Sequence, residues 1–136
     1  MIGLLFTKMV AMQVRKDKNL IVDLTFDFAI QVIRYAESLE KRHRYVIARQ
    51  LLKSGTGIGA NVRESQHAES RADFIHKLKI AAKEAGETEY WLLLCKNSDG
   101  YESCDELILQ CQSILKVLSK IIASSKTRLS TNFRIN

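Results

Sequence analysis

Apolar residues recur at steps of three and four along most of the chain. This spacing places them on one face of an α-helix, which completes a turn every 3.6 residues. The first stripe predicts a helix from about Leu20 to Glu40, followed by a short basic turn at 41–44. Its members are Ile21, Leu24, Phe28, Val32, Tyr35 and Leu39. No run alternates apolar and polar residues in the way a strand does, and proline is absent.

The second stripe contains three glycines, Gly55, Gly57 and Gly59, within an otherwise helical pattern. Glycine inside a helix costs roughly 0.5 to 1 kcal/mol relative to alanine, so the glycines need a structural reason. We expect Gly55 and Gly59, four residues apart, to permit close helix packing. The stripe itself comprises Ile47, Leu51, Ser54, Ile58, Asn61 and Ser65.

Asn61 is a polar residue on this inner stripe. A buried polar group without a partner costs about 1 to 3 kcal/mol. We therefore expect Asn61 to form a hydrogen bond to a neighbouring helix.

Two capping boxes predict the starts of two further helices. Residues 70–73 (Ser-Arg-Ala-Asp) start the third, which reaches a break at 97–100, and residues 103–106 (Ser-Cys-Asp-Glu) start the fourth. The third has an alanine-rich middle that suits close approach by the glycines of the second. Its stripe is Phe74, Leu78, Ala81, Ala85, Thr88, Leu92 and Cys95, and that of the fourth is Leu107, Cys111, Leu115, Leu118 and Ile122.

Four amphipathic helices with short connections indicate an all-α fold, an antiparallel up-down four-helix bundle. We expect the bundle to occupy residues 20–127. Residues 1–19 form an N-terminal extension, for which disorder is one alternative, and either Met1 or Met12 can be the initiator. Residues 128–136 lose the apolar repeat and are expected to fray as a C-terminal tail.

Composition limits the class of protein. The 136 residues, 46% of them hydrophobic, suffice for one domain with its own core. Three cysteines, Cys95, Cys104 and Cys111, have no Cys-x-x-Cys spacing, and no secretion signal precedes them, so we expect reduced thiols in a cytoplasmic protein. We also expect no stretch long enough to span a bilayer, and so no membrane partner.

Candidate chemistry is sparse. The Gly-x-Gly-x-Gly run at 55–59 could suggest a phosphate cradle, but a dinucleotide fingerprint needs a strand before the glycines. His67-Ala68-Glu69 matches the His-x-Glu of zinc deaminases, whose Pro-Cys-x-x-Cys cannot occur in a chain without proline. We expect no catalytic residue, cofactor or metal, and therefore no enzyme.

Three further side chains have both a functional and a structural interpretation. Glu64 and Glu89 could be an acid/base pair, but we expect them to bond to Asn61, to an arginine or to a neighbouring subunit. Trp91, next to Tyr90 and three leucines, either closes the bundle core or lies between subunits, and we favour the subunit interface.

The formal net charge of +6 favours acidic partners such as RNA, although excess lysine also serves solubility. The basic residues fall into two sets that could contact phosphates. The first set is Lys41, Arg42, Arg44, Arg49 and Lys53, and the second is Lys116, Lys120, Lys126 and Arg128.

Five ordered motifs resemble those of the four-helix-bundle proteins encoded in intervening sequences of bacterial 23S rRNA genes. They are LLKSGT (51–56), IGANVRE (58–64), ADFIHKL (72–78), AKEA (82–85) and ETEYWL (87–92). The likeness spans roughly Leu20 to Ser124. Gly57 departs from the pattern, which has serine there.

The resemblance implies a left-handed antiparallel bundle that assembles as a cyclic homo-oligomer, with five subunits as the implied number. It implies no reaction. Such proteins are similar to the accessory protein of diversity-generating retroelements, a basic barrel that works with a reverse transcriptase and nucleic acid.

These observations lead to a ranked set of functions. The first is a non-enzymatic oligomer that binds structured nucleic acid, RNA or DNA, through phosphates. The second is a protein-interaction scaffold for a nearby-encoded enzyme such as a reverse transcriptase. The third is RNA cleavage by Glu89 with a basic neighbour, which requires a cleft with a paired acid and base.

Overall fold

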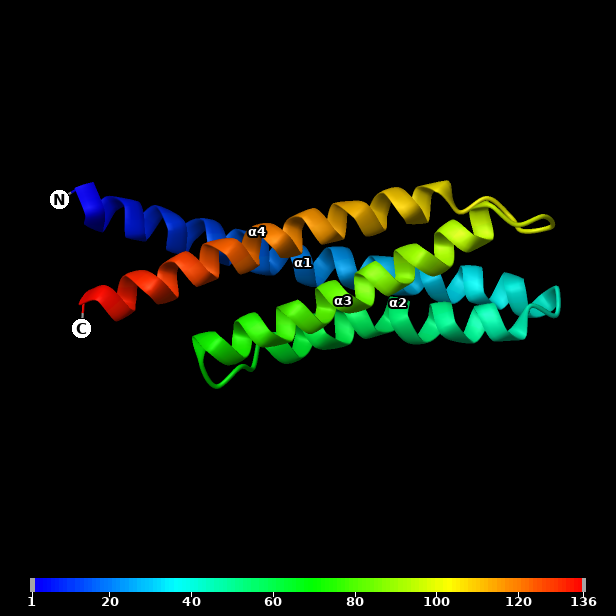
Figure 1. The fold of residues 1–136 in the computed structure, drawn as a ribbon, viewed down its shortest axis with the longest axis horizontal. Coiled ribbons are helices and arrows are strands. Elements are labelled where there is room, and N and C mark those ends of the chain that lie inside the picture. The colour runs from blue at the N-terminus through cyan, green and yellow to red at the C-terminus, as the bar shows by residue number, and fades with distance from the viewer. Residues whose placement is uncertain (1, 136) are drawn as a thin grey trace.

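The computed structural model describes residues 2–135, and within that range every regular element is an α-helix (Figure 1). No strand occurs there, so the all-α class is confirmed. The helices are α1 (Ile2–Lys41), α2 (Tyr45–Ser65), α3 (Arg71–Lys96) and α4 (Asp105–Ile135).

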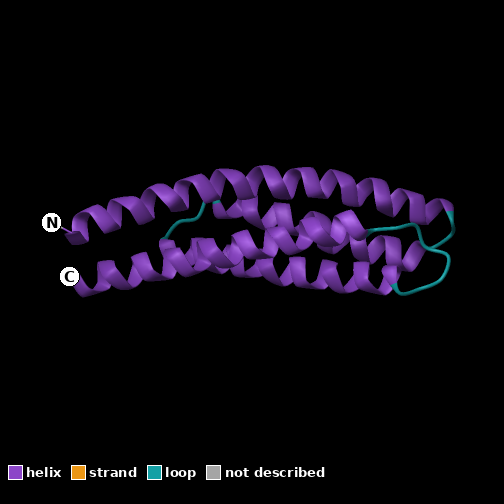
Figure 2. Ribbon diagram, turned by 90° about the horizontal axis from the view of Figure 1, so that it is seen from above, coloured by secondary structure: helices purple, strands orange, loops and turns teal. Residues whose placement is uncertain are grey.

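The helices pack around a common core in a closed cycle. Each helix contacts the next one in sequence, and α1 also contacts α4. The chain reverses direction at each connection (Figure 1). Since α2 and α4 do not contact each other, they occupy diagonal positions. The described ends of α1 and α4 extend beyond α2 and α3 at the same end of the molecule (Figures 1 and 2).

The long outer helices correct two sequence-based boundaries. Residues 2–19 continue α1 without a break, instead of forming a disordered extension, and residues 128–135 continue α4 instead of a frayed tail. The helical stripe fades in these segments because α2 and α3 do not reach them, whereas helix formation needs only local hydrogen bonds and the absence of proline. One result is that Leu4, Leu5 and Phe6 are at least 60% exposed.

The predicted core stripe of α3 is confirmed at every position, since all seven residues are buried. The other stripes are partly wrong. In α1 the inner position is taken by Thr25, while Leu24 is half-buried. In α4 the core positions are Ile114 and Ile121, and the predicted Leu115 and Ile122 lie at the edge.

Gly55 lies where α2 packs closely against Val32 of α1. A Cβ atom built on Gly55 would lie 2.6 Å from Val32 Cγ1 and 2.9 Å from its Cγ2, which no real Cβ tolerates. At Gly59 a Cβ would lie 3.4 Å from the carbonyl oxygen of Thr25. The close packing predicted for these two glycines is therefore present, but the partner is α1 and not the alanine-rich α3.

The alanines of α3 serve a different neighbour. Ala81 and Ala85 are fully buried, and the Cys111 thiol of α4 donates to the Ala85 carbonyl oxygen at 3.2 Å. A small side chain at position 85 leaves this carbonyl accessible to a group on another helix. The small-residue surfaces of α2 and α3 were therefore predicted correctly, but the prediction that Gly55 and Gly59 pack against the alanines of α3 was wrong.

A polar contact lies in the middle of the core. Thr88 Oγ1 of α3 lies 2.9 Å from Ser54 Oγ of α2 and 2.8 Å from the carbonyl oxygen of Glu84. A hydroxyl has one proton. If Thr88 donates it to Glu84, Ser54 donates in turn to Thr88, and both buried oxygens are satisfied.

Ser70, the serine of the first predicted capping box, is confirmed as the N-cap of α3. Ser70 Oγ accepts the Asp73 amide at 3.0 Å, while the Asp73 carboxylate accepts from the Glu69 amide at 3.2 Å. The second box is displaced by one residue, because α4 begins at Asp105 and Cys104 precedes it. The Cys104 carbonyl oxygen accepts from the Ile108 amide, as an N-cap residue does.

The expectation of no membrane-length apolar stretch is wrong. Within the described residues, one segment of α4, Asp105–Arg128, is long and apolar enough to cross a bilayer by length and composition alone. Its buried residues pack in the bundle, and its exposed positions are mostly polar, including Gln112, Lys116 and Ser119. The core helix of a bundle has this same pattern, because a wide apolar face packs against its neighbours.

We predict that Gly55→Ala destabilises the protein and that Gly86→Ala stabilises it. Val32 is β-branched and buried, with one strongly preferred rotamer in a helix, so overpacking at Gly55, typically about 1 to 3 kcal/mol, exceeds the helix-propensity gain of about 0.5 to 1 kcal/mol. A Cβ atom added at Gly86 would meet no neighbouring atom within 4 Å, so only the gain applies there. Chemical denaturation followed by circular dichroism measures both changes.

Val32→Ala combined with Gly55→Ala is the control for this explanation. Removing the two Val32 methyl groups gives the new Cβ room, so the pair should be more stable than the sum of the single changes predicts. Equal stabilisation by Gly55→Ala and Gly86→Ala would contradict the tight contact.

Candidate nucleic-acid interface

The first basic set is divided by the structure. Arg42 and Arg44, at the turn between α1 and α2, contact the α3–α4 connection. Arg42 forms an ion pair with Glu102 at 3.2 Å and donates to the Gly100 carbonyl oxygen at 3.1 Å. The Arg44 guanidinium lies 4.8 Å from the centre of the Tyr101 ring. These two arginines therefore link the α1–α2 turn to the α3–α4 connection. Arg42 is paired with a carboxylate, and Arg44 lies beside an aromatic ring.

All five members of the first set are exposed, and the other three are Lys41, Arg49 and Lys53. Arg49 and Lys53 are one helical turn apart and so share a face of α2. Among the side chains that the structure describes, none of the three has an ion-pair partner.

The second basic set lies along α4. Lys116, Lys120 and Lys126 are exposed, and Arg128 is half-buried near Arg71 of α3. Because α2 and α4 occupy diagonal positions and do not contact each other, Arg49 and Lys53 of α2 lie apart from the lysines of α4 within a single chain.

The structure brings together three arginines that the sequence did not single out as a group. A cavity of about 250 Å³ is lined by Arg15 of α1, Arg71 of α3 and Arg128 of α4, and we call it the arginine pocket. The remaining lining residues are Ser65, Gln66, Ala68, Ser70 and Phe74. Arg15 was missed because residues 1–19 were assigned to an extension. Continuing the first helix to the N-terminus would have placed it at the same end as Arg128.

Burial and a neighbouring positive charge both act on Arg71 in the arginine pocket. Burial lowers the pKa of the Arg71 guanidinium, and the positive charge of Arg128 lowers it further. Within the described part of the chain, no carboxylate forms an ion pair with Arg15, Arg71 or Arg128.

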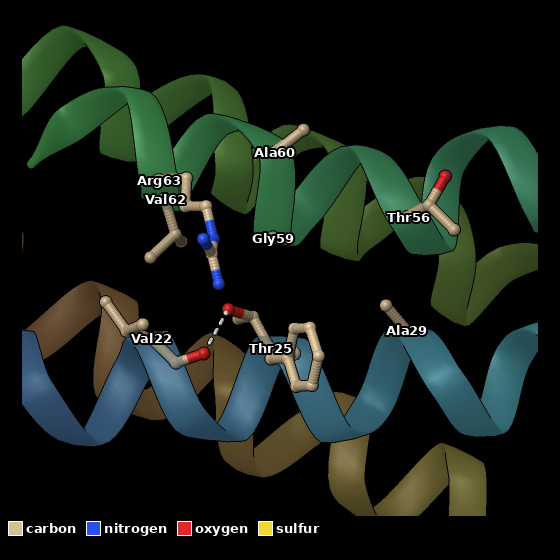
Figure 3. Close-up of a pocket in the computed structure, with 9 residues that line it drawn as sticks. Val22, Thr25, Ala29, Thr56, Gly59, Ala60, Val62 and Arg63 are labelled. Carbon is tan, nitrogen blue, oxygen red and sulfur yellow. Dashed lines mark hydrogen bonds between the residues drawn. The ribbon is translucent and has the colours of Figure 1, made fainter.

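A second hollow, of about 200 Å³, separates α1 from α2 beside Gly59 (Figure 3). Thr25 donates to the Ile21 carbonyl oxygen at 2.7 Å and Thr56 to that of Leu52 at 2.6 Å, so both hydroxyls are bonded within their own helices. The Arg63 guanidinium extends from α2 toward α1, 5.8 Å from the centre of the Phe26 ring. This hollow offers an apolar surface and one cation, without an acid/base pair.

The predicted bond from Asn61 to another helix is wrong. Asn61 Nδ2 donates to the carbonyl oxygen of Gly57 in its own helix, at 2.8 Å. Asn61 is only half-buried, and the adjacent Val62 occupies the core position. A residue at the edge of the interface can satisfy its amide within the helix, so it needs no partner across the bundle.

Glu64 and Glu89, the two predicted structural carboxylates, have different neighbours and do not form an acid/base pair. Glu64 accepts from Lys77 Nζ of α3 at 3.0 Å, so its partner is neither Asn61 nor an arginine. Glu89 is half-buried beside Cys111 of α4. No cluster of three or more metal-ligating side chains occurs among the described residues.

Trp91 lies at the border of the core. It is half-buried against the core cluster, and its Nε1 donates to Glu87 at 3.3 Å. Its neighbours are more open: Tyr90 is 56% exposed, and Leu93 and Leu94 are 40% and 39% exposed. This face of α3 therefore leaves apolar surface uncovered in the single chain.

All three cysteines are buried free thiols. Burial raises the pKa of Cys95 to about 11 and that of Cys111 to about 12. Burial also raises the pKa of Cys104, whose thiol donates to the Leu92 carbonyl oxygen at 3.3 Å. Since the thiolate is the nucleophile, these cysteines are structural at neutral pH.

We predict that the folded protein resists thiol reagents at pH 7.5. The raised pKa values keep the thiols protonated, and burial blocks access, so labelling with iodoacetamide should be at least about tenfold slower than in denaturant. Mass spectrometry of quenched samples measures the rate at each cysteine. Rapid labelling of Cys111 in the folded protein would contradict its placement in the core.

Comparison with known proteins agrees with this architecture. Residues 17–120 match the family described as 23S rRNA-intervening sequence protein. A solved structure from Bacteroides thetaiotaomicron, described as a protein of unknown function from the S23 ribosomal protein family, is similar with 39% identity and a TM-score of 0.75. The alignment covers 79% of this chain and 98% of that one. No curated protein matches. The chain therefore belongs to the 23S rRNA-intervening sequence protein family.

Proposed function

We propose that this family member is a non-enzymatic, cytoplasmic homo-oligomer that binds structured RNA through backbone phosphates. The observation that carries this proposal is the charge of α4: it has Lys116, Lys120, Lys126 and Arg128, and no acidic residue follows Glu106 in the chain. Beyond its acidic first turn, Asp105 and Glu106, α4 carries charge of one sign, which matches the regular charge of a nucleic-acid backbone.

The physical basis of binding is release of counterions. Each lysine or arginine that neutralises a phosphate frees a condensed cation, so affinity falls as salt rises. Phosphate contacts position a protein on nucleic acid and carry no sequence information directly. The proposed complex is accordingly sensitive to salt and shows little sequence preference.

The proposed unit is the antiparallel, left-handed up-down four-helix bundle, and the proposed assembly is a ring, with five subunits as the family resemblance implies. The uncovered apolar face at Tyr90, Leu93 and Leu94 supports burial between subunits. A ring can also place the α2 cations of one subunit beside the α4 cations of the next, which the single chain cannot do.

We predict that Lys116→Gln with Lys120→Gln weakens RNA binding and its salt dependence. Each lost phosphate contact reduces the slope of log affinity against log salt by about 0.7 to 0.9, so the pair should reduce it by roughly one to two. Fluorescence anisotropy with a labelled RNA hairpin, from low to high potassium chloride, measures both quantities. Native mass spectrometry of the same samples gives the number of subunits with and without RNA.

Lys79→Gln with Lys83→Gln is the matched control, because these exposed lysines are also one turn apart but lie on α3. The change in net charge is the same, so equal weakening would show that total charge, and not the α4 surface, is responsible. Absence of RNA binding at low salt would overturn the proposal.

The alternative function is a scaffold for a nucleic-acid enzyme encoded nearby, such as a reverse transcriptase. The hollow beside Gly59 favours it, since Phe26 is 53% exposed there and an apolar side chain of a partner could pack against it. Co-purification of one protein that survives nuclease treatment, and is lost on Phe26→Ser, would support the scaffold.

A further inference from the structure

The arginine pocket lies at the end of the bundle where α3 begins. Its three cations come from three helices, at positions 15, 71 and 128, and its lining includes Phe74 and Ser65. Arginines that converge on one cavity repel one another. Such an arrangement is retained most easily when an anion occupies the space between them.

The groups around the pocket donate hydrogen bonds. Ser70 Oγ uses a lone pair to accept the Asp73 amide, which leaves its hydroxyl proton available to the cavity that Ser70 lines. The pocket also adjoins the N-terminus of α3, a 26-residue helix whose dipole favours negative charge there.

The described lining of the arginine pocket carries no negative charge. None of the described residues that line the cavity is acidic. Asp73, two residues after Arg71, directs its carboxylate to the Glu69 amide at 3.2 Å, and neither Asp73 nor Glu69 is part of the lining. The cations of the pocket are therefore not neutralised from within the described part of the chain.

We propose that this pocket binds a phosphate group, and that in the nucleic acid it takes the terminal phosphate of an RNA strand. The assignment deepens the proposed function and rests on it. Planar guanidinium groups bind phosphate oxygens in pairs, which suits arginine better than lysine at such a site.

The number of cations favours a terminal phosphate over an internal one. A phosphate monoester carries about −1.5 to −2 charges at pH 7, whereas each internal diester carries one. Three arginines match the more highly charged group. The volume of about 250 Å³ is below the roughly 300 to 1,000 Å³ typical of ligand pockets, and it suits one charged group with its waters more than a whole nucleotide.

The first experiment uses inorganic phosphate as the probe. Thermal unfolding of the full chain is compared in phosphate and in chloride of equal ionic strength. The wild type should gain melting temperature in phosphate, because a ligand that binds only the folded state stabilises it. Arg71→Gln should lose that gain, and Lys79→Gln should keep it. Arg128→Lys serves as a second variant that keeps the charge but loses the paired donors, so its gain should be smaller than that of the wild type.

The second experiment compares one RNA sequence with a 5′-phosphate, with a 3′-phosphate and with neither. Wild-type protein should bind a phosphorylated form roughly tenfold more tightly, the gain expected from new charge-assisted hydrogen bonds. Arg71→Gln should bind all three forms equally while retaining the salt-dependent affinity that α4 supplies.

The outcomes separate the two proposals. A phosphate-dependent stabilisation without preference for phosphorylated RNA would overturn the terminal-phosphate assignment and identify a site for free phosphate. RNA binding with neither effect would overturn the pocket and leave the proposed function standing. Stabilisation by phosphate with no RNA binding at any salt concentration would overturn the proposed function.

Discussion

The contact between Gly55 and Val32 sets the distance between α1 and α2, and much of the molecule depends on that distance. With a side chain at Gly55 the two helices could not approach as they do, since its Cβ would lie 2.6 Å from Val32 Cγ1. One turn along, Gly59 continues the approach against the Thr25 backbone and forms part of the hollow beside Phe26. The missing side chain of Gly55 thus permits a close contact with Val32, and that of Gly59 leaves part of a surface hollow open. A helix accepts such glycines because the packing they permit outweighs their cost in helix propensity.

Most polar groups inside the bundle have hydrogen-bond partners, and among the described side chains the buried exceptions are Gln110 Oε1 and Ser125 Oγ. Thr25 bonds within its own helix, Ser54 and Thr88 bond to each other, and the buried thiols of Cys104 and Cys111 donate to carbonyl oxygens. Each of these contacts meets the requirement that a buried polar atom have a partner. The chemically informative features lie instead on the outside, in the charges of α4 and the arginine pocket.

The arrangement of charge follows from the order of the helices. Because α2 and α4 are diagonal, Arg49 and Lys53 of α2 lie apart from the lysines of α4, and a surface that joins these cations requires more than one chain. Arg42 and Arg44 are engaged with the α3–α4 connection, which leaves Lys41, Arg49 and Lys53 as the members of the first set without such a contact. At the opposite end, three helices bring Arg15, Arg71 and Arg128 together. The basic residues that lie close together in the folded protein are therefore not the same groups that lie close together in the sequence.

The sequence by itself determined the helices, because a helix depends on local hydrogen bonds and its apolar period shows which face is buried. The α3 stripe from Phe74 to Cys95 and the Ser70 cap could be predicted residue by residue. Only the tertiary structure decided which helix faces Gly55, which hydrogen bond Asn61 makes, and which arginines meet. These depend on the rotation of each helix about its axis and on helix length beyond the core, as Leu115 and Arg15 show. A periodic pattern defines a face to within one residue, and a shift of one residue, about 100° of rotation, is enough to change the partner of a side chain.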